Sequence, residues 1–144
     1  MRILNNCLEN KKYTSVPIWF MRQAGRYLKE FRDIKKNNPD FINLCLNEKL
    51  VHKISLQPIK RFDLDAIILF SDILIIPYGL GQKVLFKKNL GPILGNLNLD
   101  SIIKIKQTDF LNRVYPVYKS ISLLKNNMAK MLIKFFTHPL TKEL

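Results

Sequence analysis

Ala66-Ile67-Ile68-Leu69-Phe70 is a short, continuous apolar run, and Ser71 and Asp72 follow it directly. An apolar run rich in β-branched residues, without polar alternation, is typical of a parallel strand buried on both faces. Because a parallel strand needs parallel neighbours, the run predicts an α/β architecture. Asp72 would then lie at the carboxyl end of the strand, where barrel enzymes place residues that do chemistry, or it would cap the next turn.

Residues with helical spacing precede and follow this strand. A helix is expected from Asn47, a plausible N-cap, to Phe62, and Pro58 should kink or end it. A second helix, the crossover helix, is expected around residues 114–128, and Pro116 limits how early it can begin.

Between the strand and the second helix, two short apolar segments flank a turn. Residues 84–86 and 93–94 lie on either side of a segment rich in Lys, Asn, Gly and Pro. This arrangement predicts a small hairpin inserted after the strand.

Composition and cysteine usage restrict the class of protein. The 144 residues are 47% hydrophobic and contain no repeat or linker, so one domain over residues 1–144 is expected. The most apolar stretch, 66–80, is shorter than the ~20 residues of a membrane-spanning helix. Cys7 and Cys45 have no metal-ligand spacing, and the N-terminus lacks the apolar core of a secretory signal. A reduced, cytoplasmic protein without a membrane partner is the expectation.

The chain is strongly basic, with a formal net charge of +13. Clustered Lys and Arg would attract phosphate or carboxylate groups, and a nucleic-acid-binding module is one reading of this charge. The basic residues are scattered, however, and form no block of five or six like charges. The pattern therefore favours a partner other than nucleic acid.

The segment Trp19-Phe20-Met21-Arg22-Gln23-Ala24-Gly25-Arg26-Tyr27-Leu28 is the most informative for binding. Arg side chains bind carboxylate or phosphate through two parallel hydrogen bonds, and the small Ala24-Gly25 pair lets the backbone approach the same anion. An anion-binding loop is one interpretation. Arg22 and Arg26 at i, i+4 spacing on a solvated helix face is the alternative.

Three segments occur in the order in which one enzyme family carries them: Trp19 to Leu28, Leu56-Gln57-Pro58, and Phe70-Ser71-Asp72-Ile73-Leu74. In these segments the chain resembles the uroporphyrinogen decarboxylases of the haem pathway. The resemblance is strongest over residues 13–124, whereas residues 125–144 form a divergent tail. It implies the N-terminal portion of a (β/α)₈ barrel. This portion is incomplete, because a whole barrel needs ~250 residues.

The resemblance implies a cofactor-independent carboxy-lyase. Uroporphyrinogen III, a tetrapyrrole with eight carboxylates, would lose four acetate carboxyl groups to give coproporphyrinogen III, with no metal or organic cofactor. Asp72 would be the catalytic residue, accepting hydrogen bonds from the pyrrole N–H groups and stabilising positive charge on the ring. Arg22, Gln23, Ala24, Gly25 and Arg26 would bind substrate together with Asp72. A homodimer is also implied.

The end of the chain departs from the family pattern. Leu132, Ile133, Phe135, Pro139 and Thr141 can be aligned with the family's second strand, but Lys134 and Thr137 occupy its glycine positions. An unpaired edge beside the strand at residues 66–70 would favour association or aggregation. An inactive, truncated remnant of the enzyme is therefore the alternative function.

Two further assignments are weaker by comparison. His52 and His138 lie away from the three matching segments and are expected at the surface rather than in catalysis. Corrinoid-linked methyltransferases of the same barrel superfamily use a zinc site of His and Cys, for which the sequence carries no cluster.

Overall fold

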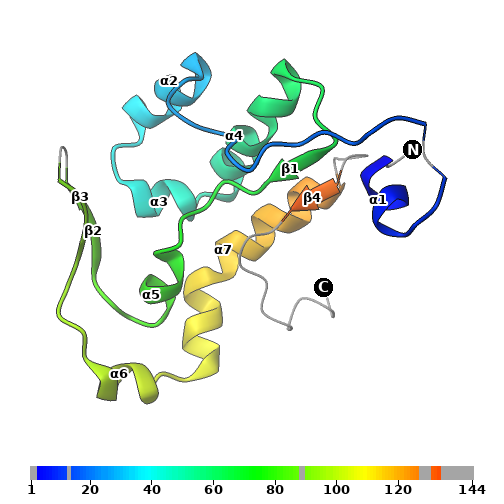
Figure 1. Ribbon diagram of the computed structural model, residues 1–144. Helices are drawn as coiled ribbons and strands as arrows, with labels where there is room; N and C mark the ends of the chain where they lie inside the picture. Colours follow the sequence, from blue (N-terminus) through cyan, green and yellow to red (C-terminus); the bar gives the residue numbers. More distant parts are fainter. Residues whose placement is uncertain (1–2, 13, 88–89, 127–130, 134–144) are drawn as a thin grey trace.

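The computed structural model describes residues 3–12, 14–87, 90–126 and 131–133. Along the chain (Figure 1) the elements are α1 (Ile3–Leu8), α2 (Lys29–Asn37), α3 (Phe41–Cys45), α4 (Glu48–Arg61), β1 (Ala66–Ile68), α5 (Ile75–Gly79), β2 (Val84–Lys87), β3 (Gly91–Leu94), α6 (Leu99–Ile103), α7 (Gln107–Asn126) and β4 (Met131–Ile133). Among these residues, no helix is long and apolar enough to cross a membrane.

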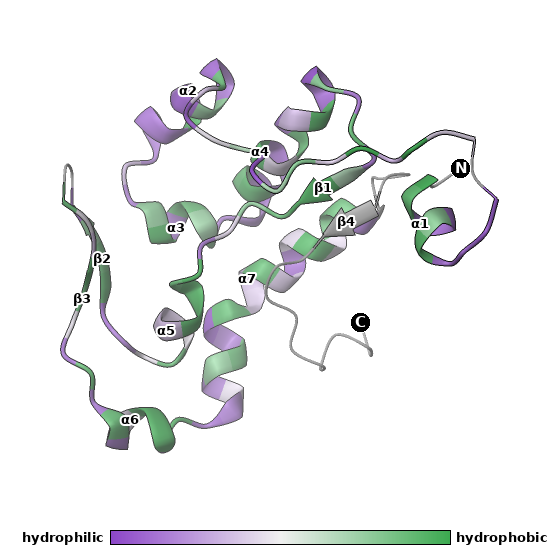
Figure 2. Ribbon diagram, viewed as in Figure 1, coloured by the Kyte–Doolittle hydropathy of each residue, from purple (hydrophilic) through white to green (hydrophobic). Residues whose placement is uncertain are grey.

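The predicted buried strand forms, and it is shorter than expected. β1 ends at Ile68 rather than at Phe70, because the Phe70 amide donates a hydrogen bond to Ser55 Oγ of α4 at 2.9 Å instead of entering a sheet. Ala66 and Ile67 are fully buried. The hydropathy colours show β1 as uniformly apolar (Figure 2), in agreement with a strand covered on both faces.

β1 and β4 form a parallel pair, with Ala66 opposite Met131 and Ile68 opposite Ile133. The predicted second strand at Leu132 and Ile133 is therefore confirmed, while positions 134–141 lie outside the described residues. The helix α7 connects the two strands, as a parallel crossover requires. The expectation of an unpaired strand was too simple, because one edge of β1 is covered by β4.

Helices α4 and α7 pack together beside the strand. Their shared core includes Val51 of α4, Leu69 just beyond β1, and Leu124 of α7. Because Leu124 is fully buried, burial of apolar surface holds the crossover helix against the strand and α4.

A two-pronged ion pair, with distances of 2.8 and 2.9 Å from Arg61 to Glu30, joins α4 to α2.

Both predicted helices contain a proline, and the structure shows that neither proline limits its helix. The helix from Asn47 forms, and Asn47 Oδ1 accepts the amide hydrogen of Leu50 at 3.0 Å as predicted for an N-cap. It continues to Arg61, close to the predicted end at Phe62, so Pro58, which is buried, does not end it. Likewise, α7 begins at Gln107, nine residues before Pro116.

The hairpin prediction is confirmed by β2 and β3, which pair antiparallel with Val84 opposite Leu94. A short helix, α5, links the end of β1 to this hairpin and packs on α7. Gly79 makes the approach possible, since a Cβ atom at this position would lie 2.7 Å from the Phe110 ring and 2.8 Å from Val114 Cγ1.

We predict that Gly79→Ala lowers the free energy of unfolding by about 1–3 kcal/mol, because the added methyl group overpacks the contact between α5 and α7. Urea unfolding followed by circular dichroism measures the change. Asn112→Ala, at an exposed position of α7, is the control and should leave the midpoint nearly unchanged. Equal midpoints for Gly79→Ala and the control would contradict this account.

Candidate functional site

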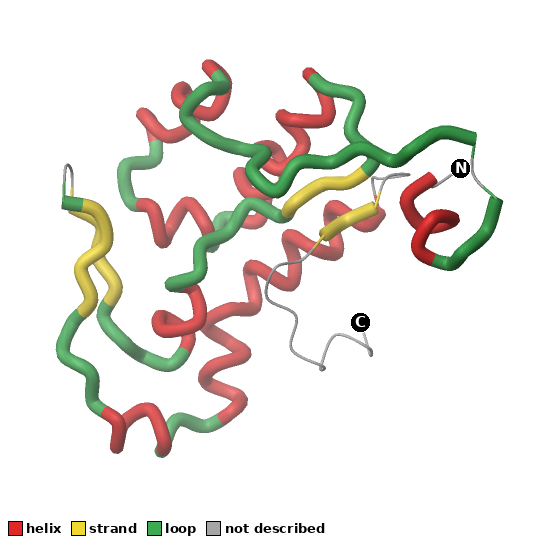
Figure 3. Tube along the Cα trace, viewed as in Figure 1, coloured by secondary structure: helices red, strands yellow, loops and turns green. Residues whose placement is uncertain are grey.

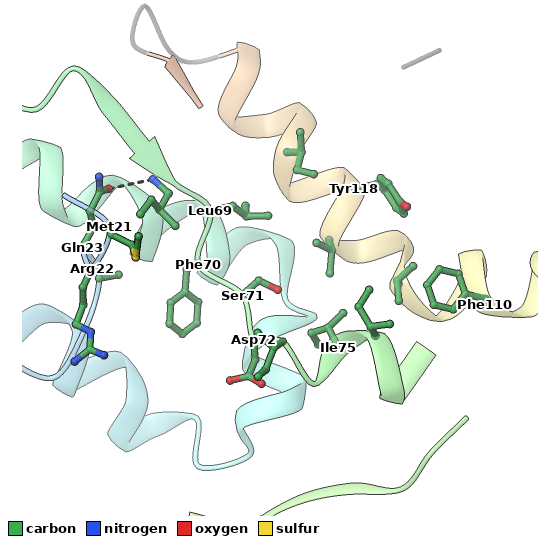
Figure 4. A pocket seen from close by; sticks show the side chains of 17 residues that line it. Met21, Arg22, Gln23, Leu69, Phe70, Ser71, Asp72, Ile75, Phe110 and Tyr118 are labelled. Carbon is green, nitrogen blue, oxygen red and sulfur yellow. Dashed lines mark hydrogen bonds between the residues drawn. The ribbon is translucent and has the colours of Figure 1, made fainter. Parts of the chain in front are cut away.

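A pocket of about 600 Å³ lies where the loop before α2, the end of β1, α5 and α7 meet (Figure 4). Most of its lining is apolar, and the charged side chains in the lining are Arg22 and Asp72. The lining residues are Met21, Arg22, Gln23, Ala24, Ile68, Leu69, Phe70, Ser71, Asp72, Ile73, Ile75, Ile76, Phe110, Val114, Val117, Tyr118 and Ile121. The two segments singled out from the sequence thus meet in one pocket.

Asp72 lies beyond the carboxyl end of β1, at the start of the turn into α5, and its side chain is half-buried. Its Oδ1 accepts a hydrogen bond from the Leu74 amide at 2.8 Å, and its backbone carbonyl accepts one from Ile75 at 3.2 Å. The sequence left capping and chemistry as alternatives. The capping role is present in the structure, and it engages one of the two carboxylate oxygens.

The arginine segment is not a helix, so the alternative of a solvated helix face is wrong. Residues 14–28 run as loops and turns until α2 begins at Lys29 (Figure 3). Arg22 and Arg26 are both exposed, but only Arg22 lines the pocket. In the close-up, the Arg22 guanidinium and the Asp72 carboxylate point to the same side, with the Phe70 ring between them (Figure 4).

Hydrogen bonds inside the loop define its shape. The Tyr27 hydroxyl donates to the Gln23 carbonyl, and the Leu28 amide donates to the Gly25 carbonyl at 3.1 Å. From α2, Arg32 Nη1 donates to the carbonyls of Arg26 and Tyr27 at 2.8 and 3.2 Å. These bonds turn the chain back on itself around Ala24 and Gly25, whereas the side chain of Arg22 is left exposed at the pocket.

Gln23 has a second connection that the sequence did not indicate. Its Nε2 donates to the Ala66 carbonyl at 2.9 Å, and its Oε1 accepts the Ile68 amide hydrogen at 3.0 Å. The side chain is buried, with 4% of its surface exposed. The carboxamide therefore connects the loop to the strand that leads to Asp72.

The wall contributed by α7 was also missed. Phe110, Val114, Val117 and Tyr118 line the pocket from one side of this helix. Their helical spacing predicted an element with an apolar face, yet the same spacing serves a helix that only covers a sheet. Because α5 packs next to the apolar face of α7, part of that face becomes a wall of the pocket.

Cys45 of α3 lies close enough to Asp72 for the carboxylate to affect its titration. Burial, and to a lesser extent the charge of Asp72, raises the pKa of the Cys45 thiol to about 12. The thiol therefore stays protonated near neutral pH and is a poor nucleophile. Among the described residues, no group of three or more His, Cys, Asp or Glu side chains could hold a metal ion.

The histidines do not reach the pocket in the part of the chain that is described. His52 of α4 is half-buried rather than fully at the surface, and its Nε2 is buried without a hydrogen-bond partner. It is not among the pocket residues. His138 lies outside the described residues.

Known proteins resemble this chain in sequence and in fold. The sequence model described as uroporphyrinogen decarboxylase (URO-D) matches residues 2–142. The chain belongs to the uroporphyrinogen decarboxylase family. A relative of that name from Agrobacterium fabrum is 43% identical over 121 residues, which cover 84% of this chain and 35% of the relative. Relatives of the same name from Chelativorans sp. and Rickettsia canadensis are 39% and 41% identical and are covered to 42% and 38%.

The chain thus spans between about a third and two fifths of the curated decarboxylases that it matches. A methyltransferase from Methanosarcina mazei has a similar structure, with a TM-score of 0.67 and 18% identity. The match covers 96% of this chain and 42% of the methyltransferase. At this identity the likeness concerns the fold, which is an incomplete N-terminal portion of a (β/α)₈ barrel.

The two cysteines should react differently with iodoacetamide at pH 8. Cys45 is 1% exposed, and a pKa raised from 9.0 to about 12 reduces its thiolate fraction about a thousandfold. Cys7, at a half-buried position in α1, should therefore be alkylated first. Mass spectrometry of peptides from the native protein measures both rates. Urea should make the rates similar, and rapid native alkylation of Cys45 would contradict the burial of its thiol.

Proposed function

We propose that this chain carries the substrate-recognition wall of a uroporphyrinogen decarboxylase, with Asp72 as the catalytic carboxylate. The observation that carries the proposal is the presence of Asp72 and Arg22 in the lining of one apolar pocket. Uroporphyrinogen has the matching chemistry, since it has apolar pyrrole rings, N–H donors at its centre and carboxylates at its periphery.

Asp72 suits the centre of such a ligand because Leu74 engages only its Oδ1. The second oxygen, together with the remaining lone pairs, can accept hydrogen bonds from pyrrole N–H groups. When carbon dioxide leaves, its bonding electron pair moves into a pyrrole ring that was protonated beforehand. A fixed negative charge beside that ring stabilises the cationic form and thereby lowers the barrier.

Arg22 suits the periphery, where its exposed guanidinium can form charge-assisted hydrogen bonds with an acetate or propionate group. Arg26, Ala24 and Gly25 complete the loop in this proposal, with Arg26 binding a carboxylate outside the pocket described here. The formal net charge of +13 also supports an anionic ligand, because it raises the encounter rate with a polycarboxylate.

The whole reaction needs more of the barrel than this chain provides. We propose that the remaining wall comes from residues outside this sequence, in the same polypeptide or in another, and that the assembled enzyme is a homodimer, as the family resemblance implies. A non-catalytic remnant is the second candidate, supported by Lys134 and Thr137 at positions where the family pattern has glycine. We propose the cytoplasm as the compartment of this protein, because a reducing environment fits the two free cysteines of the chain.

Co-expression with the part of the Rickettsia canadensis relative that this chain does not match separates the two candidates. The decarboxylase proposal expects conversion of uroporphyrinogen to products with fewer carboxylates, measured by chromatography of the oxidised porphyrins. Soluble co-assembly without any conversion would favour the remnant.

In that assembly, we predict that Asp72→Asn lowers turnover at least about a hundredfold, because the negative charge is lost. The substitution keeps an oxygen that can accept the Leu74 amide hydrogen, so the cap and the melting temperature should be preserved. Asp109→Asn, at an exposed position of α7, is the matched control. Wild-type turnover by Asp72→Asn would contradict the catalytic assignment.

For this chain alone, we predict that Arg22→Met weakens binding of uroporphyrin I by about ten- to a hundredfold, as expected for a lost charge-assisted hydrogen bond. Fluorescence titration of the porphyrin measures the dissociation constant. Arg113→Met removes an equal charge from an exposed position outside the pocket lining and is the control. Equal losses in the two variants would indicate nonspecific attraction to a basic surface.

A further inference from the structure

The Gln23 carboxamide occupies the position of a residue in a neighbouring strand. In a parallel ladder, a residue donates its N–H to the carbonyl of the residue that precedes its partner. Its own carbonyl accepts the N–H of the residue that follows the partner. Gln23 makes this pair of bonds around Ile67, at 2.9 Å to the Ala66 carbonyl and at 3.0 Å from the Ile68 amide. A single side chain thus satisfies backbone groups of β1 that would otherwise lack partners at this edge.

The loop is also attached to the strand one residue earlier. The Asp65 amide donates to the Ile18 carbonyl at 2.8 Å, and Asp65 Oδ2 accepts the Ile18 amide hydrogen at 2.8 Å. Figure 1 shows this stretch of the chain running along β1 on the side away from β4. The segment is therefore fixed at one end, by Ile18, to the residue before β1, and at the other end, by Gln23, to β1 itself.

This attachment sets the position of the neighbouring arginine. Arg22 precedes Gln23 directly, and Asp72 follows Ile68 by four residues without an intervening helix. The Gln23 bonds thus join the loop that carries Arg22 directly to the strand that leads to Asp72. Two opposed bonds to one strand restrict both sliding and rotation of the loop along its edge.

We propose that Gln23 is a positioning residue that acts through Arg22, and that its carboxamide sets the distance between Arg22 and Asp72 by docking on the edge of β1. This inference rests on the proposed role of Arg22 in carboxylate binding. The carboxamide oxygen and one N–H group of Gln23 are engaged by β1, which supports a positioning role in addition to the substrate contact implied by the family resemblance. Docking on β1 requires both the length of the Gln23 side chain and its pair of donor and acceptor. Met has neither hydrogen-bonding group, and ionised Glu has no donor, so neither can fully replace Gln23.

Hydrogen exchange of backbone amides tests the docking without any ligand. In Gln23→Met, the Ile68 amide should exchange at least about tenfold faster, because its acceptor is removed. The Phe70 amide, which donates to Ser55, should be unaffected. Ser55→Ala is the matched control and should reverse this pattern. Unchanged exchange of Ile68 in Gln23→Met overturns the proposal.

A double-mutant cycle with uroporphyrin I tests the action through Arg22. Gln23→Met should weaken binding about tenfold in the wild-type background and have no further effect when Arg22→Met is present. Gln23→Glu keeps an acceptor for Ile68 but lacks the donor when ionised, so its loss should be intermediate. It also provides a second variant if Gln23→Met fails to fold. Equal losses from Gln23→Met in both backgrounds would show that Gln23 acts independently of Arg22 and overturn the proposal.

The outcomes separate this inference from the proposed function. Wild-type binding with an unaffected Gln23→Met variant overturns the positioning role and leaves the function standing. Absence of uroporphyrin binding by the wild-type chain contradicts the proposed function, and the positioning role with it, whatever the exchange rates of Ile68.

Discussion

The rest of this structure depends on how β1 satisfies its backbone groups while its residues are buried. Ala66 and Ile67 are fully buried, so an amide or carbonyl without a partner at this strand would lose its hydrogen bonds to water without compensation. β4 covers one edge from the far end of the chain, and Gln23 covers backbone groups from the segment before α2. The Gln23 bonds thereby join residues that are 43 and 45 positions apart in the sequence.

The same constraint accounts for the positions of Arg22 and Asp72. Because Gln23 docks on β1, the adjacent Arg22 is held beside the strand end. The strand stops when the Phe70 amide turns to Ser55, and the chain then enters the turn that Asp72 caps. The binding loop and the carboxylate therefore meet as a consequence of hydrogen bonds that the strand needs for its own stability.

In the proposed function, Asp72 combines a structural role with a catalytic one. Its Oδ1 stabilises the turn into α5, and this bond also fixes the direction of the carboxylate toward the pocket. Cys45 lies within the electrostatic reach of the carboxylate, and burial keeps its thiol neutral.

Local patterns in the sequence determined the buried strand after residue 65, the N-cap at Asn47 and the hairpin. The matching segments determined the family, and alignment with the family indicated the second strand at Leu132. These features depend on neighbours a few positions away, or on segments distinctive enough to be matched directly. Only the tertiary structure decided that α4 continues past Pro58, that the arginine segment is a loop, and that α7 lines the pocket. The partner of Gln23 belongs with these, because a hydrogen bond to a backbone group 43 residues away leaves no periodic or local trace in the sequence.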